Sequence, residues 1–153
     1  MGAKAANPNV NVEIDYSGQF PPSAAPKCKE LALKQIANGS QVVFQVAGGC
    51  GLGALSAAKE KGVWGIGVDA DQSYLGPSIL TSGIKKVDVA VYTAMKQTQD
   101  GTFKGGRDLV FDLKNGGVGV GKISSKVPAG LVAQMKAQEA KIRSGAITIP
   151  ATL

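Results

Sequence analysis

The chain has 153 residues, enough for one ordinary domain or for about half of a larger protein. Its 17 lysines and arginines outnumber its 11 aspartates and glutamates, giving a formal net charge of +6, and it contains no histidine. The lack of histidine excludes Ser-His and Cys-His nucleophile pairs, histidine-bound zinc and imidazole acid–base catalysis. Because 44% of the residues are apolar, the chain can bury a core.

The positive charge does not indicate a nucleic-acid partner. Basic residues are scattered along the chain, and arginine, the usual reader of base edges, occurs only at Arg107 and Arg143. The sequence contains no run of about 20 apolar residues, the length that spans a bilayer, and no apolar signal core at its start. We therefore expect no nucleic-acid partner, and neither a signal nor an anchor in the chain as given.

The two cysteines, Cys28 and Cys50, are too few for a disulfide framework and lack the spacing of metal ligands. In an oxidising compartment they could form one disulfide, which the sequence leaves open.

Hydrophobic periodicity predicts alternating strands and helices. The predicted strands lie at residues 10–16, 41–46, 63–68, 79–84 and 108–113. The predicted helices lie at residues 24–37, 54–61, 87–98 and between a cap at Ser125 and Gly145, and residues 115–121 are irregular. The runs at 41–46 and 63–68 are typical of strands covered on both faces. The pattern predicts an α/β fold, a twisted parallel sheet flanked by helices.

Ligands of such sheets bind beyond the carboxyl ends of the strands. In this chain those ends are residues 16–20, 46–50, 68–72 and 82–86. We expect these four segments to converge on whatever the chain binds.

A glycine-rich segment, Ala47-Gly-Gly-Cys-Gly-Leu-Gly53, joins a predicted strand to a predicted helix, and Asp69 ends the next strand. This arrangement is similar to a dinucleotide-binding fingerprint, in which glycines admit a pyrophosphate and the acid binds ribose hydroxyls. It would make the chain a Rossmann-like domain of an oxidoreductase. Alternatively, the glycines only tighten the turn. A P-loop is excluded, because no Gly-Lys-Ser/Thr follows.

Three side chains at the strand ends are candidates for a ligand site or for local structure. Asp69 follows its strand directly and is the better ligand-facing acid, whereas Asp71 is expected to cap a turn. Phe20 lies in a polar, proline-rich loop. It could pack over the following helix or form an aromatic platform under a flat ring.

Several segments in order resemble one known family, the basic membrane protein family of bacterial lipoproteins. These segments are Tyr16-Ser-Gly-Gln-Phe20, the glycine loop, Ile66-Gly-Val-Asp-Ala-Asp-Gln72, Leu80-Thr-Ser-Gly-Ile-Lys85 and Val89-Ala-Val-Tyr-Thr-Ala94. Members are substrate-binding proteins of ABC transporters, many of them purine-nucleoside receptors. The resemblance implies one lobe of a type I periplasmic binding protein, with residues 1–86 as the ligand-binding lobe. Residues 87–153 would complete that lobe and pack partly on a first lobe.

The resemblance also implies the site and the partners. Phe20 would stack on the purine, Gly48 and Gly49 would contact the ligand through their backbone, Asp69 would accept the ribose hydroxyls, and Lys85 would donate to the sugar. The ligand would be a purine nucleoside, bound without chemistry and without a cofactor or metal. The chain departs from the family pattern in two places. It has Cys50 where the family often has threonine, and Pro21-Pro22 lengthens the Phe20 loop. Both departures leave the preferred base open.

In the family, the full-length protein is extracytoplasmic, lipid-anchored and works with ABC permease subunits. Because members are roughly twice as long, the resemblance implies that the N-terminal lobe is missing from this chain. We therefore expect weak or absent nucleoside binding by the chain alone, and a homodimer that covers the exposed face.

Overall fold

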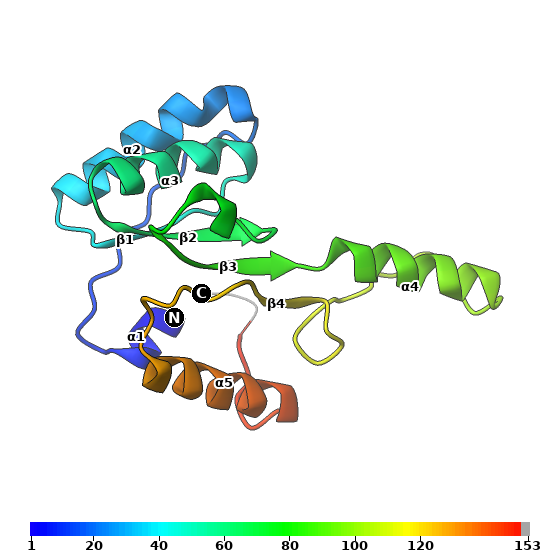
Figure 1. The fold of residues 1–153 in the computed structure, drawn as a ribbon. Coiled ribbons are helices and arrows are strands. Elements are labelled where there is room, and N and C mark those ends of the chain that lie inside the picture. The colour runs from blue at the N-terminus through cyan, green and yellow to red at the C-terminus, as the bar shows by residue number, and fades with distance from the viewer. Residues whose placement is uncertain (151–153) are drawn as a thin grey trace. The chain divides into compact units, whose positions relative to one another are not determined.

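In the computed structural model, which describes residues 1–150, the chain forms two compact units. The first unit comprises Met1–Ile66 together with the chain from Ile149, and the second comprises Gly67–Thr148. Four strands are hydrogen-bonded in the order β1-β2-β3-β4, and helices flank them (Figure 1). The strands are β1 (Val42–Phe44), β2 (Trp64–Asp69), β3 (Ile79–Lys85) and β4 (Val118–Val120).

In the first unit, two helices pack side by side (Figure 1). They are α2 (Ala25–Ala37) and α3 (Gly51–Glu60), close to the predicted helices at 24–37 and 54–61. A short helix, α1 (Gly2–Ala6), and two 3-10 turns, η1 (Pro22–Ala24) and η2 (Gly48–Cys50), complete the unit's helical elements. The core consists of small residues, including Ala32, Ala57 and Ala58. Small side chains let the helix axes approach closely.

The predicted parallel pairing is confirmed for β1 and β2, where Val43 lies opposite Gly65. The prediction that β1 is covered on both faces is wrong, because Val43 is buried while Val42 and Phe44 are exposed. The apolar run at residues 41–46 therefore contains a strand with only one buried face.

In the second unit, β3 pairs with β4 in antiparallel register, with Gly83 opposite Val120. The sequence predicted a parallel sheet, and the antiparallel pairing of β3 with β4 differs from that prediction. β4 lies inside the segment predicted to be irregular, and the strand predicted at 108–113 is absent from those residues. The carboxylate of Asp112 accepts the backbone N–H groups of Lys114 and Asn115, and the Asn115 amide donates to the Val110 carbonyl. The Asp112 N–H also donates to the Asn115 side-chain oxygen. The turn therefore uses the Val110 carbonyl and the Asp112 N–H, which a strand at 108–113 would need for its ladder.

Residues 10–16 are extended but form no strand. Instead, their acidic side chains contact α2: Asp15 accepts hydrogen bonds from Lys34 and Gln35, and Glu13 accepts one from Asn38. The alternating apolar residues Val12, Ile14 and Tyr16 are exposed, and the acidic residues between them make the contacts with α2.

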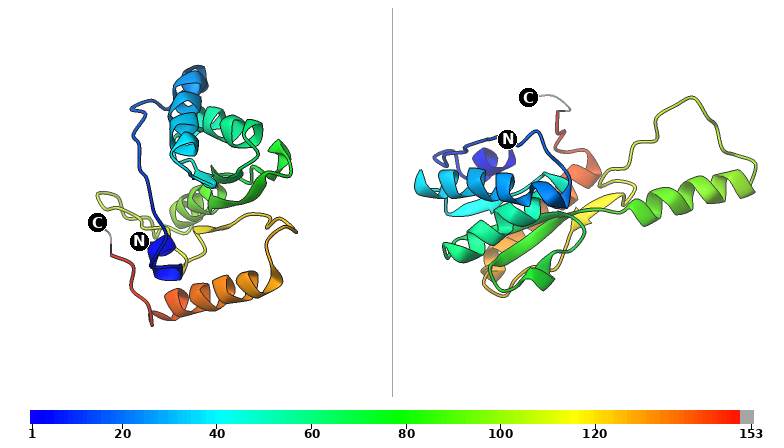
Figure 2. Two further views of the ribbon diagram at one scale, coloured as in Figure 1. Left: turned by 90° about the vertical axis from the view of Figure 1, so that its left-hand side faces the viewer. Right: turned by 90° about the horizontal axis from the view of Figure 1, so that it is seen from above.

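Two longer helices belong to the second unit, α4 (Val87–Gln99) and α5 (Ala129–Ser144), and η3 (Ser73–Leu75) lies between β2 and β3. No residue of α4 is buried, and the helix extends away from the end of β3 (Figure 1). A long loop then returns toward β4 (Figure 2). Within residues 1–150, no helix has the length and apolar character needed to cross a membrane.

The predicted division at residues 86 and 87 stays a prediction. Residues 151–153, the end of its second segment, lie outside the described residues.

Candidate functional site

Three of the predicted site residues, Phe20, Gly48 and Gly49, lie together in the first unit. The Cys50 N–H donates a hydrogen bond to the Phe20 carbonyl at 3.1 Å, which ties the Phe20 loop to η2. Gly48 has a φ of +54°, and a Cβ there would stand 3.1 Å from the Phe20 carbonyl oxygen. Phe20 is 71% exposed, so it is not buried over a helix and it is accessible to a ligand.

The other glycines of the loop are required by packing. A Cβ at Gly49 would stand 2.6 Å from the Pro22 ring, one at Gly51 would meet the Gln45 side-chain oxygen, and one at Gly53 would meet the Ala25 carbonyl. These close approaches explain the glycines without a phosphate ligand. They favour the interpretation in which the glycines shape the turn over the dinucleotide fingerprint.

The two cysteines form a disulfide. Cys28 in α2 is bonded to Cys50 in η2, with Cα atoms 5.6 Å apart, and both residues are buried. The sequence left this pairing open because it cannot show that α2 and η2 are neighbours.

The remaining two predicted residues, Asp69 and Lys85, lie together in the second unit. The Asp69 carboxylate and the Lys85 ammonium are 2.9 Å apart, and both side chains are about half exposed or more. An exposed ion pair contributes at most about 1 kcal/mol to stability. The pair therefore presents an acceptor and a donor to solvent at little cost to the fold.

Asp69 also has an unusual backbone conformation. Its φ is 69°, the one positive φ outside glycine among residues 1–150, and the Ala70 N–H donates to the Val68 carbonyl at 2.9 Å. This bond makes residues 68–70 a γ-turn of the rarer, positive-φ kind, which is strained. Residues with a strained backbone cluster at functional sites. The strain lowers stability, so it persists only where the surrounding structure imposes it.

A buried pair of polar side chains, Gln72 and Ser82, holds that turn. The Gln72 side-chain oxygen accepts the Val68 N–H at 3.0 Å, and the Gln72 N–H donates to the Ser82 hydroxyl at 3.0 Å. A Cβ at Gly67 would stand 2.6 Å from both side-chain oxygens, so only glycine leaves room for them. The sequence pattern did not predict a role for these residues, although polar residues beside the end of an apolar strand are a usable signal.

Asp71 has the structural role predicted for it. Its carboxylate accepts the Ser73 N–H at 3.0 Å and the Lys122 N–H at 3.2 Å, linking the turn after β2 to the segment after β4. The hydrogen bond from the Ser73 backbone, with a smaller contribution from that of Lys122, holds the pKa of Asp71 below its ordinary value.

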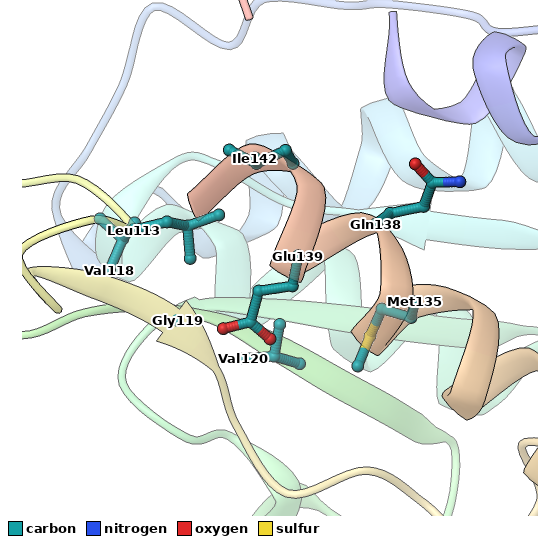
Figure 3. A pocket seen from close by; sticks show the side chains of 8 residues that line it. All are labelled: Leu113, Val118, Gly119, Val120, Met135, Gln138, Glu139 and Ile142. Atoms are coloured by element: carbon teal, nitrogen blue, oxygen red, sulfur yellow. The ribbon is translucent and has the colours of Figure 1, made fainter. Parts of the chain in front are cut away.

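A groove of about 320 Å³ lies between β4 and α5 in the second unit (Figure 3). Val118 and Val120 from the strand face Met135 and Ile142 from the helix. Its lining is mainly apolar and includes none of the five predicted site residues.

Comparison with known proteins identifies the family. The model of the Bmp family, described as PnrA-like ABC transporter substrate-binding proteins, matches residues 1–152, and the chain belongs to this family. The chain is 40% identical to the nucleoside-binding protein BmpA of an ABC transporter from Lactococcus lactis, over 78% of this chain and 39% of that protein. It is 35% identical to basic membrane protein A1 from Borrelia garinii, over 97% of this chain and 45% of that protein.

Solved structures agree with the fold. A crystal structure from Bacillus halodurans, described as a transcriptional activator of the comK gene, has a TM-score of 0.88 at 27% identity and covers 97% of this chain and 52% of that one. A solute-binding protein of an ABC transporter system from Aeropyrum pernix has a TM-score of 0.77 at 26% identity, over 97% and 50%. The chain thus spans about half the length of the relatives it matches.

Proposed function

We propose that this chain supplies one side of the ligand site of an extracytoplasmic ABC importer component that binds purine nucleosides. The observation that carries the proposal is the solvent-accessible Asp69–Lys85 pair, whose charged groups are 2.9 Å apart. Asp69 lies on the strained turn at the end of β2, and Lys85 ends β3. A carboxylate accepting two vicinal hydroxyls forms charge-assisted hydrogen bonds, each contributing about 1.5–3 kcal/mol. An ammonium group beside it is suited to donate to a sugar oxygen.

In the first unit, the exposed Phe20 ring offers a stacking surface for a purine base. Stacking of a base on an aromatic side chain contributes about 1–3 kcal/mol. Gly48 is exposed and Gly49 is partly exposed, so a ligand can reach their backbone. The name of the relative from Lactococcus lactis, a nucleoside-binding protein, supports the same ligand class.

The proposal is one of binding without catalysis. The relatives are substrate-binding proteins, and the chain has no histidine to act as an acid or base near neutral pH. The Cys28–Cys50 disulfide supports an extracytoplasmic location, where disulfides persist. Lipid anchoring and permease partners belong to this proposal as properties of the full-length form.

The test is a titration of the chain, followed by amide NMR, with guanosine, 2′-deoxyguanosine and NAD. We expect weak, saturable binding of guanosine, with shifts at Gly48, Gly49 and the residues around Asp69. The affinity should be low because ligand sites bury about 70–90% of their ligand, and one lobe covers only part of it. Removal of the 2′-hydroxyl should weaken binding further. Tighter binding of NAD than of guanosine would contradict the proposal and favour the dinucleotide interpretation.

A further inference from the structure

We propose that the Cys28–Cys50 disulfide is a redox-dependent positioning element for the ligand contacts of the first unit. In the oxidised chain it holds Phe20, Gly48 and Gly49 in place, and its reduction releases them while the unit stays folded. The inference rests on the proposed function for the role of these three residues, but the position of the disulfide does not depend on that role.

The three residues are all attached to Cys50. Gly48 and Gly49 precede it within η2, and its N–H donates to the Phe20 carbonyl at 3.1 Å. Cys50 itself is completely buried. Movement of Cys50 would therefore shift the Phe20 loop and the glycine backbone together.

The other end of the disulfide is a rigid anchor. Cys28 lies near the start of α2, is buried, and belongs to the helix that packs along α3. The bond closes a loop across a sequence separation of 22 residues, which includes β1 and the chain leading to η2. The disulfide thus ties η2 to the long helix α2. Without it, the backbone around η2 would be held by hydrogen bonds such as that from the Ala47 N–H to the Gln45 side chain.

The fold of the unit does not depend on the disulfide alone. Ala32, Val43, Ala54, Ala57 and Ala58 are buried around it, and β1 is paired with β2. Asp69 and Lys85 are held by contacts within the second unit. Loss of the disulfide should therefore affect one group of ligand contacts and spare the other.

The chemical step is ordinary thiol–disulfide exchange. A dithiol such as dithiothreitol gives two electrons and two protons, the sulfur–sulfur bond breaks, Cys28 and Cys50 become thiols, and the reductant closes to a cyclic disulfide. Because both cysteines are buried, reduction needs local opening, and completion is verified by titration of two free thiols per chain.

The experiment compares the oxidised chain, the reduced chain and the double variant Cys28→Ala/Cys50→Ala by hydrogen–deuterium exchange. We expect amides at residues 48–50 to exchange at least 10-fold faster in the reduced chain and in the variant, with residues 68–85 unchanged. Reoxidation should restore the wild-type rates, and dithiothreitol should not change the variant. Val43→Ala serves as the control, since it removes core packing in the same unit and leaves the disulfide intact.

Nucleoside titrations provide the second readout. Reduction should weaken guanosine binding 10-fold or more, while the ratio of guanosine to 2′-deoxyguanosine affinity stays the same because Asp69 is unaffected. Equal exchange rates in both redox states would overturn the inference, as would loss of the helical far-ultraviolet signal on reduction. If the oxidised chain binds no nucleoside, the proposed function fails, and the exchange rates still decide this inference.

Discussion

Asp69 has a positive φ, a backbone conformation that glycine and asparagine adopt more readily than most residues do. Its carboxylate can therefore be removed by substitution without adding backbone strain. Glycine accepts a positive φ without strain, and asparagine tolerates it better than alanine does. Asp69→Asn and Asp69→Gly therefore remove the carboxylate without adding backbone strain, whereas Asp69→Ala would do both.

We predict that Asp69→Asn and Asp69→Gly weaken guanosine binding by about 2 kcal/mol, because the charge-assisted bonds to the ribose are lost. The free energy of unfolding should change by less than about 1 kcal/mol, because the lost ion pair is exposed. NMR titration and urea unfolding measure the two quantities. Unchanged guanosine affinity in both variants would remove Asp69 from the site.

Asp71 differs from Asp69 because its carboxylate is used by the fold. Its pKa is lowered by hydrogen bonds from the Ser73 and Lys122 backbones. A carboxylate with a lowered folded-state pKa stabilises the protein above its unfolded-state pKa of about 4. That stabilisation is lost as the pH falls through the lower, folded-state pKa.

We therefore predict that Asp71→Asn lowers the free energy of unfolding at pH 7, and that the difference from wild type shrinks as the pH falls below about 4. Urea unfolding at several pH values measures this. Asp108→Asn is the matched control, since Asp108 is exposed. A difference between Asp71→Asn and wild type that stays constant down to pH 2 would contradict the prediction.

Among the elements, the pair α2 and α3 depends on a glycine at their contact. A Cβ at Gly53 would clash with the Ala25 carbonyl oxygen, which belongs to the backbone of α2 and cannot rotate away. Gly130 in α5 has no atom within 4 Å of its would-be Cβ. The two helical glycines therefore form a matched comparison.

We predict that Gly53→Ala lowers the free energy of unfolding by about 3 kcal/mol, because the two helices must separate. Gly130→Ala should leave it unchanged or raise it by up to about 1 kcal/mol, since alanine is the better helix former. Thermal or urea unfolding followed by circular dichroism measures both. Equal stability of the two variants would show that the α2–α3 contact is more adaptable than its geometry indicates.

The chain as a whole exposes apolar surface on α4. Val87, Val91 and Met95 are each more than half exposed and recur every four residues, which places them on one side of the helix, with Tyr92 beside them. An exposed apolar stripe of this kind favours association.

We predict that the isolated chain self-associates through this stripe into a homodimer. Val91→Lys combined with Met95→Lys should shift the chain toward monomer in analytical ultracentrifugation, because a lysine in the contact would bury an unpaired charge. Leu131→Lys, at an exposed apolar position of α5, serves as the control and should have no such effect. A wild-type chain that sediments as a monomer would contradict the prediction.

The motifs and the main helices could be predicted from the sequence, because these features depend on local patterns. The helices α2 and α4 follow from periodicity and their end signals, and β2 and β3 from short apolar runs bounded by turns. Phe20 and Asp69 could be proposed as ligand contacts because each lies at the end of a segment predicted as a strand, and their roles stay predictions. The family could be recognised because its motifs occur in order along the chain.

Features that join distant segments were decided only by the tertiary structure. The Cys28–Cys50 bond, the antiparallel pairing of β4 with β3 and the support of the Asp69 turn by Ser82 each link residues far apart in the sequence. Residues 10–16 show the same limit, since period-two alternation predicts an extended chain but not whether its partner is a strand or the side chains of α2. Local propensity determines the conformation of a segment, whereas its partners depend on packing and hydrogen bonding across the whole unit.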